Sequence, residues 1–253
     1  MPWNPDQYNQ FKTERFSPFL DLISHIKDRP YLKGVDLGCG TGELTKILAD
    51  SLTHASILGI DESFEMLLHT PKQDNIVFQQ RRIEDQMQDD EMWDLIVANA
   101  SLQWVDDHQK LFLQMISKLW PGGQLAIQMP SQTENLLNKL LLELVQEEPY
   151  ASALFGWKRI SPMLTMDEYA TLFYEAGGED IVMYQKMYPI MAKTQDDLFE
   201  FIAGSALIPY MERLPEALKE QFTKSFKQNI KFHFPKVPAL YAFKRLIMYA
   251  RFT

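Results

Sequence analysis

The sequence predicts an α/β fold with a doubly wound, mostly parallel sheet, and three observations support this. Short apolar runs alternate with amphipathic helical patterns, a glycine-rich turn follows the first of these runs, and 46% of the 253 residues are hydrophobic. Parallel strands need long crossover connections, usually helices, and helices on both faces leave the strands almost wholly apolar. The hydrophobic fraction is sufficient for a large core and argues against disorder.

The first half of the chain contains the expected crossover units. A one-sided helix is expected before Pro30, because apolar residues recur there at three- and four-residue steps. Pro121-Gly122-Gly123 is expected to end a later helix. The expected strands cover residues 34–37, 56–60, 76–78, 93–98 and 124–129, and the expected helices residues 44–52, 62–68 and 110–119.

After Pro130 the pattern becomes mostly helical, and two further strands complete a sheet of seven. Helices are expected over residues 131–145, 165–176, 194–205 and 215–234, a loop over 150–163, and strands over 181–188 and 240–251. We therefore expect an N-terminal helical segment (1–30), a ligand-binding core (31–130) and the remainder of the sheet (131–253). The last part carries helical cap insertions at 131–164 and 190–236.

Composition narrows the classes of partner. The formal net charge of −9 repels polyphosphate, so a nucleic-acid partner is not expected. No apolar run approaches the roughly 18–20 residues that span a bilayer, so a membrane partner is not expected either. The first residues lack the basic and apolar regions of a signal peptide, and we expect a cytoplasmic protein. The single cysteine, Cys39, excludes an intrachain disulfide.

The glycine-rich turn after the first strand predicts a binding site built from backbone. Glycines at 38, 40 and 42 permit φ > 0 and a close approach by a ligand, and the following helix presents free N–H groups. A dinucleotide-binding fingerprint would place its third glycine where Glu43 stands. Asp36 and Glu43 would crowd a pyrophosphate with negative charge, so a ligand with a cationic amino group suits the turn better.

Asp61 ends the second strand, about twenty residues after the turn, where a carboxylate can accept both hydroxyls of a ribose. The alternative is a helix cap for the segment that follows. Because the glycine turn stands in the matching register, ribose binding is the favoured interpretation.

Together, the Asp36–Gly42 turn, Asp61 and the strand ending at Asn99 resemble class I S-adenosylmethionine-dependent methyltransferases. The chain also resembles bacterial trans-aconitate methyltransferases, through Trp3-Asn4-Pro5, Tyr8, Phe11, Glu14-Arg15, Pro18, the runs Asp94–Trp104 and Leu125–Pro130, and Ala242–Leu246. The resemblance covers almost the whole chain and is loose between residues 131 and 163. It implies a Rossmann-like sheet with a helical cap, S-adenosyl-L-methionine as cofactor, and methyl ester formation on a small-molecule carboxylic acid.

The resemblance also implies roles for individual residues. Asp36 and the backbone carbonyl of Asn99 would lie near the cofactor's ammonium group, and Met66 near its adenine. Trp104 would lie beside the reacting methyl group, the alternative being a core aromatic. The implied catalytic set is Trp104, Arg15 and Tyr8. The implied cofactor-binding set is Asp36, Gly38, Cys39, Gly40, Asp61, Glu62, Met66, Arg82, Ile83, Glu84, Asn99, Ala100 and Ser101.

Two positions depart from the family pattern. After the third strand the family has an acid that reads the adenine amino group, whereas this chain has Arg82, which offers no acceptor. Glu84 or Asp85 substitutes for it, or only backbone groups at Ile83 bind the ring. In the predicted cap, Ile208 stands where the family has an arginine, so we expect a less charged acceptor than trans-aconitate to suit the site better.

A carboxylate acceptor is ionised at neutral pH and needs no general base. Its remaining carboxylates call for guanidinium groups, and Arg15, Arg159, Arg213 and Arg245 are the candidates, Arg15 being part of the matched N-terminal motif. Asp107-His108 is expected to be a solvated helix start. The five histidines show no metal-ligand spacing, so no metal is expected.

Three alternatives remain open at this point. The chain could methylate another small-molecule acceptor, it could be a nucleotide-cofactor oxidoreductase, or it could bind the cofactor without catalysis. Glu43 in place of glycine argues against the oxidoreductase.

Overall fold

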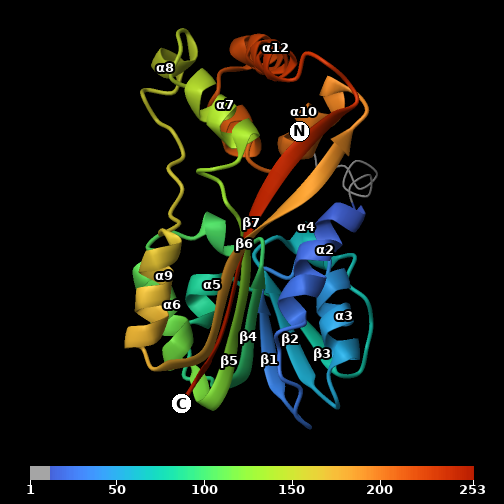
Figure 1. The fold of residues 1–253 in the computed structure, drawn as a ribbon, viewed down its shortest axis with the longest axis vertical. Coiled ribbons are helices and arrows are strands. Elements are labelled where there is room, and N and C mark those ends of the chain that lie inside the picture. Colours follow the sequence, from blue (N-terminus) through green and yellow to red (C-terminus); the bar gives the residue numbers. More distant parts are fainter. Residues whose placement is uncertain (1–11) are drawn as a thin grey trace. The chain divides into compact units, whose positions relative to one another are not determined.

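The computed structural model describes residues 12–253, and residues 12–15 by their backbone only. Within this range seven strands form one sheet in the order β3-β2-β1-β4-β5-β7-β6 (Figure 1). The strands are β1 (Lys33–Leu37), β2 (Ser56–Asp61), β3 (Ile76–Gln80), β4 (Trp93–Asn99), β5 (Leu119–Pro130), β6 (Gly178–Ala192) and β7 (Ala239–Phe252). The helices are α2 (Lys12–Ile23), α3 (Glu43–Ser51), α4 (Phe64–Leu67), α5 (Ile83–Gln86), the 3-10 helix η1 (Leu102–Trp104), α6 (His108–Ser117), α7 (Leu136–Leu144), α8 (Tyr150–Ala153), α9 (Met166–Glu175), α10 (Gln195–Ala203), α11 (Ile208–Arg213) and α12 (Glu216–His233).

Strand pairing confirms the predicted mostly parallel, doubly wound sheet. β1 pairs in parallel with both β2 and β4, β2 with β3, and β4 with β5, whereas β5 and β7 are antiparallel. The direction of winding changes between β1 and β4. Sheets of this kind bind ligands at the carboxyl ends of the strands beside that change, so the fold itself indicates where a site should be sought.

The chain divides into two compact units, each described by itself. The sheet unit comprises Phe16–Pro130, Pro162–Lys186 and Arg245–Thr253. Helices cover both faces of its sheet, α2 and α3 on one face and α5, α6 and α9 on the other (Figure 1). The second face packs on a cluster of fully buried side chains that includes Ile96, Ile127 and Phe173. Central strands buried on both faces explain why their sequences read as continuous apolar runs.

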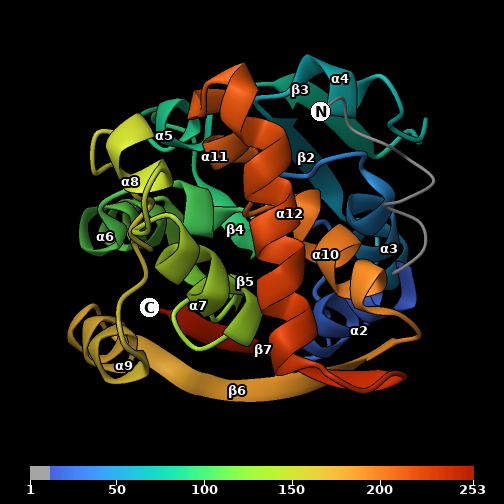
Figure 2. The ribbon, with the colours of Figure 1, turned by 90° about the horizontal axis from the view of Figure 1, so that it is seen from above.

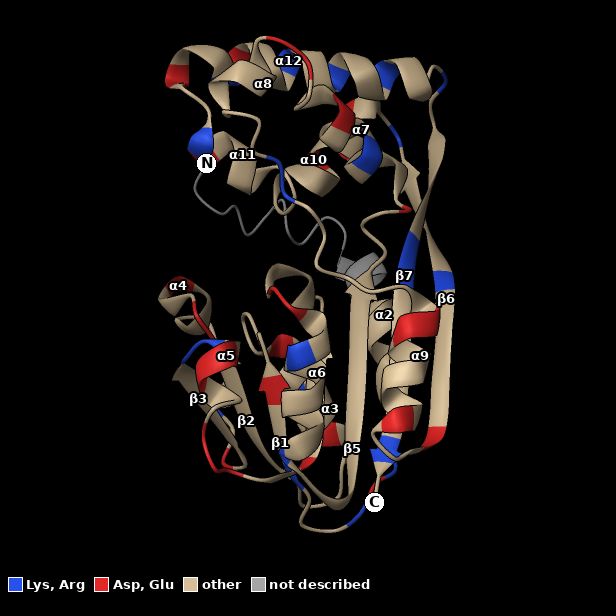
Figure 3. Ribbon diagram, turned by 90° about the vertical axis from the view of Figure 1, so that its left-hand side faces the viewer, with Lys and Arg blue, Asp and Glu red and all other residues tan. Residues whose placement is uncertain are grey.

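Among the described residues, the helical unit comprises Lys12–Arg15, Ser131–Ser161 and Met187–Lys244. Its longest helix, α12, lies beside α7 and α10 (Figure 2). Buried Phe222, Phe226 and Ile230 recur on α12 at four-residue steps, which is the pattern of a helix with one apolar face. Basic residues are spread along α12 (Figure 3), and one of them, Lys227, pairs with Asp196 of α10 at 2.8 Å. That these inserted helices act as a cap stays a prediction.

Several boundaries differ from those expected. β5 begins at Leu119, and Pro121-Gly122-Gly123 lies within it, because the pairing with β4 jumps from Trp93↔Leu119 to Leu95↔Gln124 and the extra residues bulge out. Helix α6 accordingly ends at Ser117. The segment expected to be a loop contains the short helix α8, and α11 lies between two of the helices expected from the pattern. None of the described helices has the length and apolarity required to cross a membrane.

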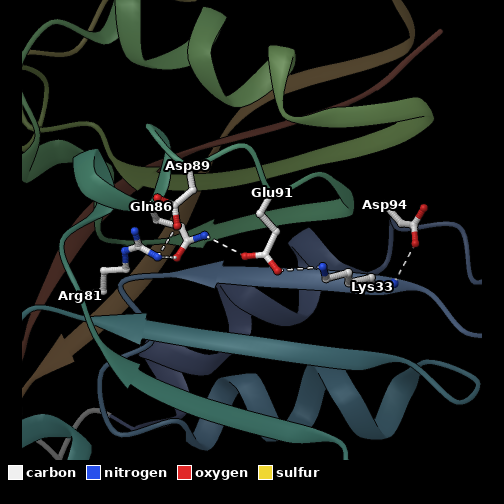
Figure 4. Close-up of polar contacts among 6 residues, drawn as sticks. All are labelled: Lys33, Arg81, Gln86, Asp89, Glu91 and Asp94. Carbon is white, nitrogen blue, oxygen red and sulfur yellow. Dashed lines mark hydrogen bonds and ion pairs between the residues drawn. The ribbon is translucent and has the colours of Figure 1, made fainter.

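A polar network ties the amino-terminal ends of β1 and β4 together (Figure 4). The Asp94 carboxylate accepts the backbone N–H of Lys33 at 2.8 Å, and the Lys33 ammonium pairs with Glu91 at 2.8 Å. Glu91 also accepts from Gln86 of α5, whose Oε1 accepts from Arg81. The contacts of Lys33 and Asp94 lie at the amino-terminal ends of β1 and β4, whereas Arg81 directly follows the last residue of β3.

Candidate active site

The glycine turn is attached directly to the end of β2. The backbone N–H groups of Gly38 and Cys39 both donate to the carbonyl oxygen of Ile60, each at 2.8 Å. Gly38, Gly40 and Gly42 have φ values of 77°, 56° and 73°, a region that side chains disfavour. The turn predicted from alternate glycines therefore has the expected backbone.

The three glycines of the turn differ in how much space surrounds the position of a Cβ atom. A Cβ on Gly38 would lie 2.3 Å from the Cβ of Ser101, and one on Gly42 would lie 2.5 Å from the ring of Phe78. A Cβ on Gly40 would meet no atom within 4 Å. A close approach by a ligand was predicted for the whole turn, and there is open space for it at Gly40. Gly38 and Gly42 are glycines because the neighbouring side chains leave no space for a Cβ.

Asp36 is buried at the end of β1, 3% exposed, and its Oδ2 accepts from the hydroxyl of Thr45 at 2.6 Å. Burial raises the pKa of this carboxyl to about 6, while the Thr45 hydrogen bond acts in the opposite direction. Sequence reasoning missed Thr45, although its place in the first turn of α3 was a signal. Burial also raises the pKa of the Cys39 thiol well above its usual range, so this cysteine is no nucleophile.

Asp61 is held from both sides by backbone. Its Oδ2 accepts from Gly40 N–H and its Oδ1 from Ser63 N–H, both at 2.9 Å. The side chain of Ser63, not that of Asp61, caps α4 by accepting from Met66 N–H. The helix-cap alternative is therefore wrong for Asp61, which instead joins the turn to the loop after β2. A carboxylate has about four lone-pair sites, so this one retains capacity for hydroxyl donors.

The segment after β4 lies against the glycine turn. Ala100, at φ 55°, donates its N–H to Gln128 of β5 at 2.8 Å, and the Ser101 hydroxyl donates to the carbonyl oxygen of Leu37 at 2.5 Å. The structure thus brings Asn99, Ala100 and Ser101 together with the turn, as expected for one shared site. Trp104 ends η1 and is 37% exposed, so the alternative of a core aromatic is wrong.

His108 is a buried residue that holds the segment after β4 through a hydrogen bond to its backbone. It is 1% exposed, its Nε2 bonds to the carbonyl oxygen of Leu102 at 2.9 Å, and its Nδ1 bonds to the hydroxyl of Tyr169. A carbonyl only accepts, so Nε2 carries the proton of a neutral ring and the Tyr169 O–H donates to Nδ1. Burial lowers the pKa of His108. The expectation of a solvated helix start is wrong for His108, while Asp107 does cap α6.

The residues expected around the adenine lie at the start of α5 and on α4. Arg82 pairs with Glu84 at 2.7 Å. Glu84, one of the acids expected to bind the adenine amino group, is therefore bonded to the arginine that stands where the family has its acid. Ile83 is half-buried against the core, Met66 is half-buried on α4, and Glu62 is exposed.

The predicted catalytic residues and arginines belong to different parts of the chain. Tyr8 lies outside the described residues, and the side chain of Arg15 is not among those described. In the helical unit, the Arg213 guanidinium lies 4.0 Å from the centre of the Trp157 ring. The backbone N–H of Arg159 donates to the Tyr210 hydroxyl. In the sheet unit, Arg245 is buried and donates to Gln128. Among the described residues no three metal-ligating side chains gather.

Comparison with known proteins decides the family. A family model described as a methyltransferase domain matches residues 29–193. The trans-aconitate 2-methyltransferase of Deinococcus radiodurans is 38% identical over 258 residues, which cover 99% of this chain and 98% of that protein. The chain belongs to the trans-aconitate 2-methyltransferase family. The Escherichia coli O1:K1 / APEC relative of the same name is 30% identical, with coverage of 99% and 98%. The resemblance stated from motifs is confirmed, and so is the methyltransferase class.

Solved structures agree on the fold. The YcgJ protein of Bacillus subtilis superposes with a TM-score of 0.61 at 13% identity, covering 94% of this chain and 98% of that one. Phosphoethanolamine N-methyltransferase 2 of Haemonchus contortus, solved with S-adenosyl-L-methionine, gives a TM-score of 0.55 at 15% identity, covering 94% of this chain and 52% of that one. This chain therefore shares its fold with proteins of quite different sequence.

The two glycines of the turn should respond differently to substitution. Gly38→Ala and Gly40→Ala both place a side chain at positive φ, which costs about 1–2 kcal/mol. Gly38→Ala also drives its Cβ into Ser101, so we expect about 1–3 kcal/mol more loss of unfolding free energy. Urea denaturation of both variants measures the difference, and an equal loss in the two would contradict the packing argument.

The buried imidazole should make stability sensitive to acid. The pKa of His108 is lowered on folding, so its contribution is complete above the unfolded pKa of about 6.5 and is lost as the pH falls below that value. Between pH 7.5 and 5.5 the wild type should lose about 1 kcal/mol more unfolding free energy than His108→Gln. The raised pKa of Asp36 acts in the opposite sense in both proteins and cancels in the comparison. Parallel pH profiles for the two proteins would show that His108 is not held neutral.

Proposed function

We propose that this protein transfers a methyl group from S-adenosylmethionine to a carboxylate of trans-aconitate or of a closely related small acid. The observation that carries the proposal is the match along essentially the full length of a protein named trans-aconitate 2-methyltransferase. A small-molecule acceptor, no nucleic-acid or membrane partner and a cytoplasmic location belong to the same proposal.

The sheet unit fits the cofactor. Gly40 leaves open space at the turn, and two backbone N–H groups orient the Asp61 carboxylate beside it. Asp61 would accept the ribose hydroxyls, and Asp36 with Asn99 would accept from the ammonium group. An ammonium near Asp36 favours the ionised carboxyl that burial disfavours. When bound, S-adenosylmethionine supplies a methyl group already activated by its sulfonium.

The chain's own contribution is alignment and exclusion of water. S-Adenosylmethionine held there would supply the methyl carbon to a carboxylate oxygen of the acceptor, and its sulfonium would become a neutral sulfide, so the residues of the site would have no proton to move. Both ring nitrogens of His108 are occupied inside the protein, which leaves this histidine unable to act as a base. Trp104, exposed on η1, is the proposed neighbour of the methyl group.

Of the alternative functions, the oxidoreductase is overturned by family membership. Methylation of another acid remains a second candidate, because Ile208 replaces the arginine expected from the family. It begins α11 and is 38% exposed, so its side chain is available to a ligand. Non-catalytic binding of the cofactor is rejected once labelled methyl groups appear in trans-aconitate or another acid.

Cofactor binding should depend on Asp61. S-Adenosylmethionine at 100 times its dissociation constant should stabilise the protein by about 2.7 kcal/mol, whereas NAD should not. Asp61→Ala should weaken binding by about 1.5–3 kcal/mol, because an ionised acceptor is removed. Ser63→Ala is the matched control, since it removes only the cap of α4. Calorimetry that finds equal affinities for Asp61→Ala and wild type would reject the ribose role.

Acceptor preference should respond to position 208. Ile208→Arg should improve kcat/KM for trans-aconitate by roughly tenfold, since a charged hydrogen bond to a carboxylate is worth about 1.5–3 kcal/mol. Glu212→Gln on the same helix changes the net charge equally and serves as control. Steady-state comparison of trans-aconitate with mono- and dicarboxylates measures the effect. Efficient wild-type turnover of trans-aconitate, with no gain in Ile208→Arg, would show that this position has no part in acceptor choice.

A further inference from the structure

Gln128, near the carboxyl end of β5, is fully buried at 0% exposure, and only half of its amide is used. Its Oε1 accepts from Nη1 of Arg245 at 2.8 Å. Its Nε2 is also buried, and no described residue accepts a hydrogen bond from it. A buried N–H donor without an acceptor is unfavourable, so a protein that keeps one commonly has a use for it. The orientation of the amide is set by Arg245, because a guanidinium can only donate and therefore requires the oxygen.

Three neighbouring strands bring the polar groups to one face of the sheet. Gln128 is the register partner of Asn99 on β4 and of Ile247 on β7. Arg245 lies two residues before Ile247 and therefore on the same face. The Oδ1 of Asn99 is likewise buried with no described hydrogen-bond partner. Donors thus lie over β5 and β7, and an acceptor lies beside them over β4, at the end of the sheet where ligands bind.

We propose that Gln128 and Arg245 form a carboxylate-binding site at the carboxyl ends of β5 and β7. The site deepens the proposed function and rests on it, because the proposed reaction brings two kinds of carboxylate to this edge of the sheet. One is the α-carboxylate of the methyl donor, and the other is a carboxylate of the acceptor that is not methylated. The amide N–H supplies one directed donor, and the guanidinium supplies charge and a planar fork. Arg245 is 7% exposed, so water screens its charge only weakly.

The placement of these two side chains suits binding more than simple cohesion of the strands. Both project from strands, whose backbone holds them more rigidly than a loop would. Gln124, four residues earlier on β5, shows what a purely structural amide looks like here. Its Oε1 accepts from Lys27 N–H and the Tyr249 hydroxyl, and its Nε2 donates to the Lys27 carbonyl. Gln128 is equally buried, but only its Oε1 is bonded, and its Nε2 lacks the bond that the Nε2 of Gln124 makes.

Gln128→Glu tests the site without changing its shape. The new carboxylate would pair with Arg245, remove the amide donor and repel any incoming carboxylate. Arg245→Lys is the second variant, which keeps the charge and loses the fork. Arg251→Gln is the control, since this arginine of the same strand pairs with exposed Glu179 at 2.7 Å. Thermal unfolding verifies that each variant is folded.

Two binding measurements distinguish the sources of the carboxylate. Calorimetry gives the dissociation constant of S-adenosylhomocysteine, and then that of trans-aconitate with S-adenosylhomocysteine present, so neither depends on turnover. We expect one of them to rise about tenfold or more in Gln128→Glu and Arg245→Lys, and to stay unchanged in Arg251→Gln. A rise in the first identifies the cofactor's carboxylate, and a rise in the second alone identifies that of the acceptor.

The proposal is overturned if both dissociation constants stay within about twofold of the wild type in whichever of the two variants folds. This outcome differs from failure of the proposed function. If the wild type methylates no acid, the proposed function fails, and the S-adenosylhomocysteine titration still decides for or against the site. If Arg251→Gln weakens binding as much as Gln128→Glu, the effect is one of general charge and the proposal is rejected.

Discussion

The carbonyl oxygen of Ile60 is the contact on which the site depends. It accepts the N–H groups of Gly38 and Cys39 at once, which attaches the turn after β1 to the end of β2. Asp61, the next residue along the chain, then accepts Gly40 N–H. Two strands and one loop are thereby fixed by three backbone donors, and two of these donors belong to Gly38 and Gly40, which have positive φ. The position of Asp61 follows from the same geometry.

A second set of contacts brings β4 into this arrangement. The hydroxyl of Ser101 donates to Leu37 at the end of β1, and its Cβ occupies the space that a side chain at position 38 would need. Glycine at 38 is therefore required by β4 as much as by the turn. His108 then holds Leu102 from the opposite side, through a hydrogen bond to its carbonyl oxygen. The segment that carries Trp104 is anchored twice within a few residues, so its backbone is held firmly at the end of β4.

The sequence predicted what depends on local pattern, and it missed what depends on partners far along the chain. β1, β2 and β4 were predicted because each is an apolar run that a turn or polar residue ends. The start of β5 was missed because Pro121 and two glycines break the pattern, whereas the tertiary fold absorbs them as a bulge. The bond between His108 and Tyr169 joins residues 61 apart, and no spacing rule reaches that far. The role of Gln128 was also missed, because a single glutamine inside an apolar strand does not reveal which partners its amide will have.

The titratable groups around the turn are consistent with a reaction that moves no proton. Asp36 bonds to Thr45, the Cys39 thiol stays protonated because of burial, and both nitrogens of His108 are engaged. Each of these three groups therefore has a structural hydrogen bond or is kept from ionising by burial. A nucleophile that arrives already ionised needs only to be aligned and stripped of water, and rigid neighbours serve both purposes. Methyl transfer to a carboxylate belongs to this class, so the proposed chemistry needs no general base from the protein.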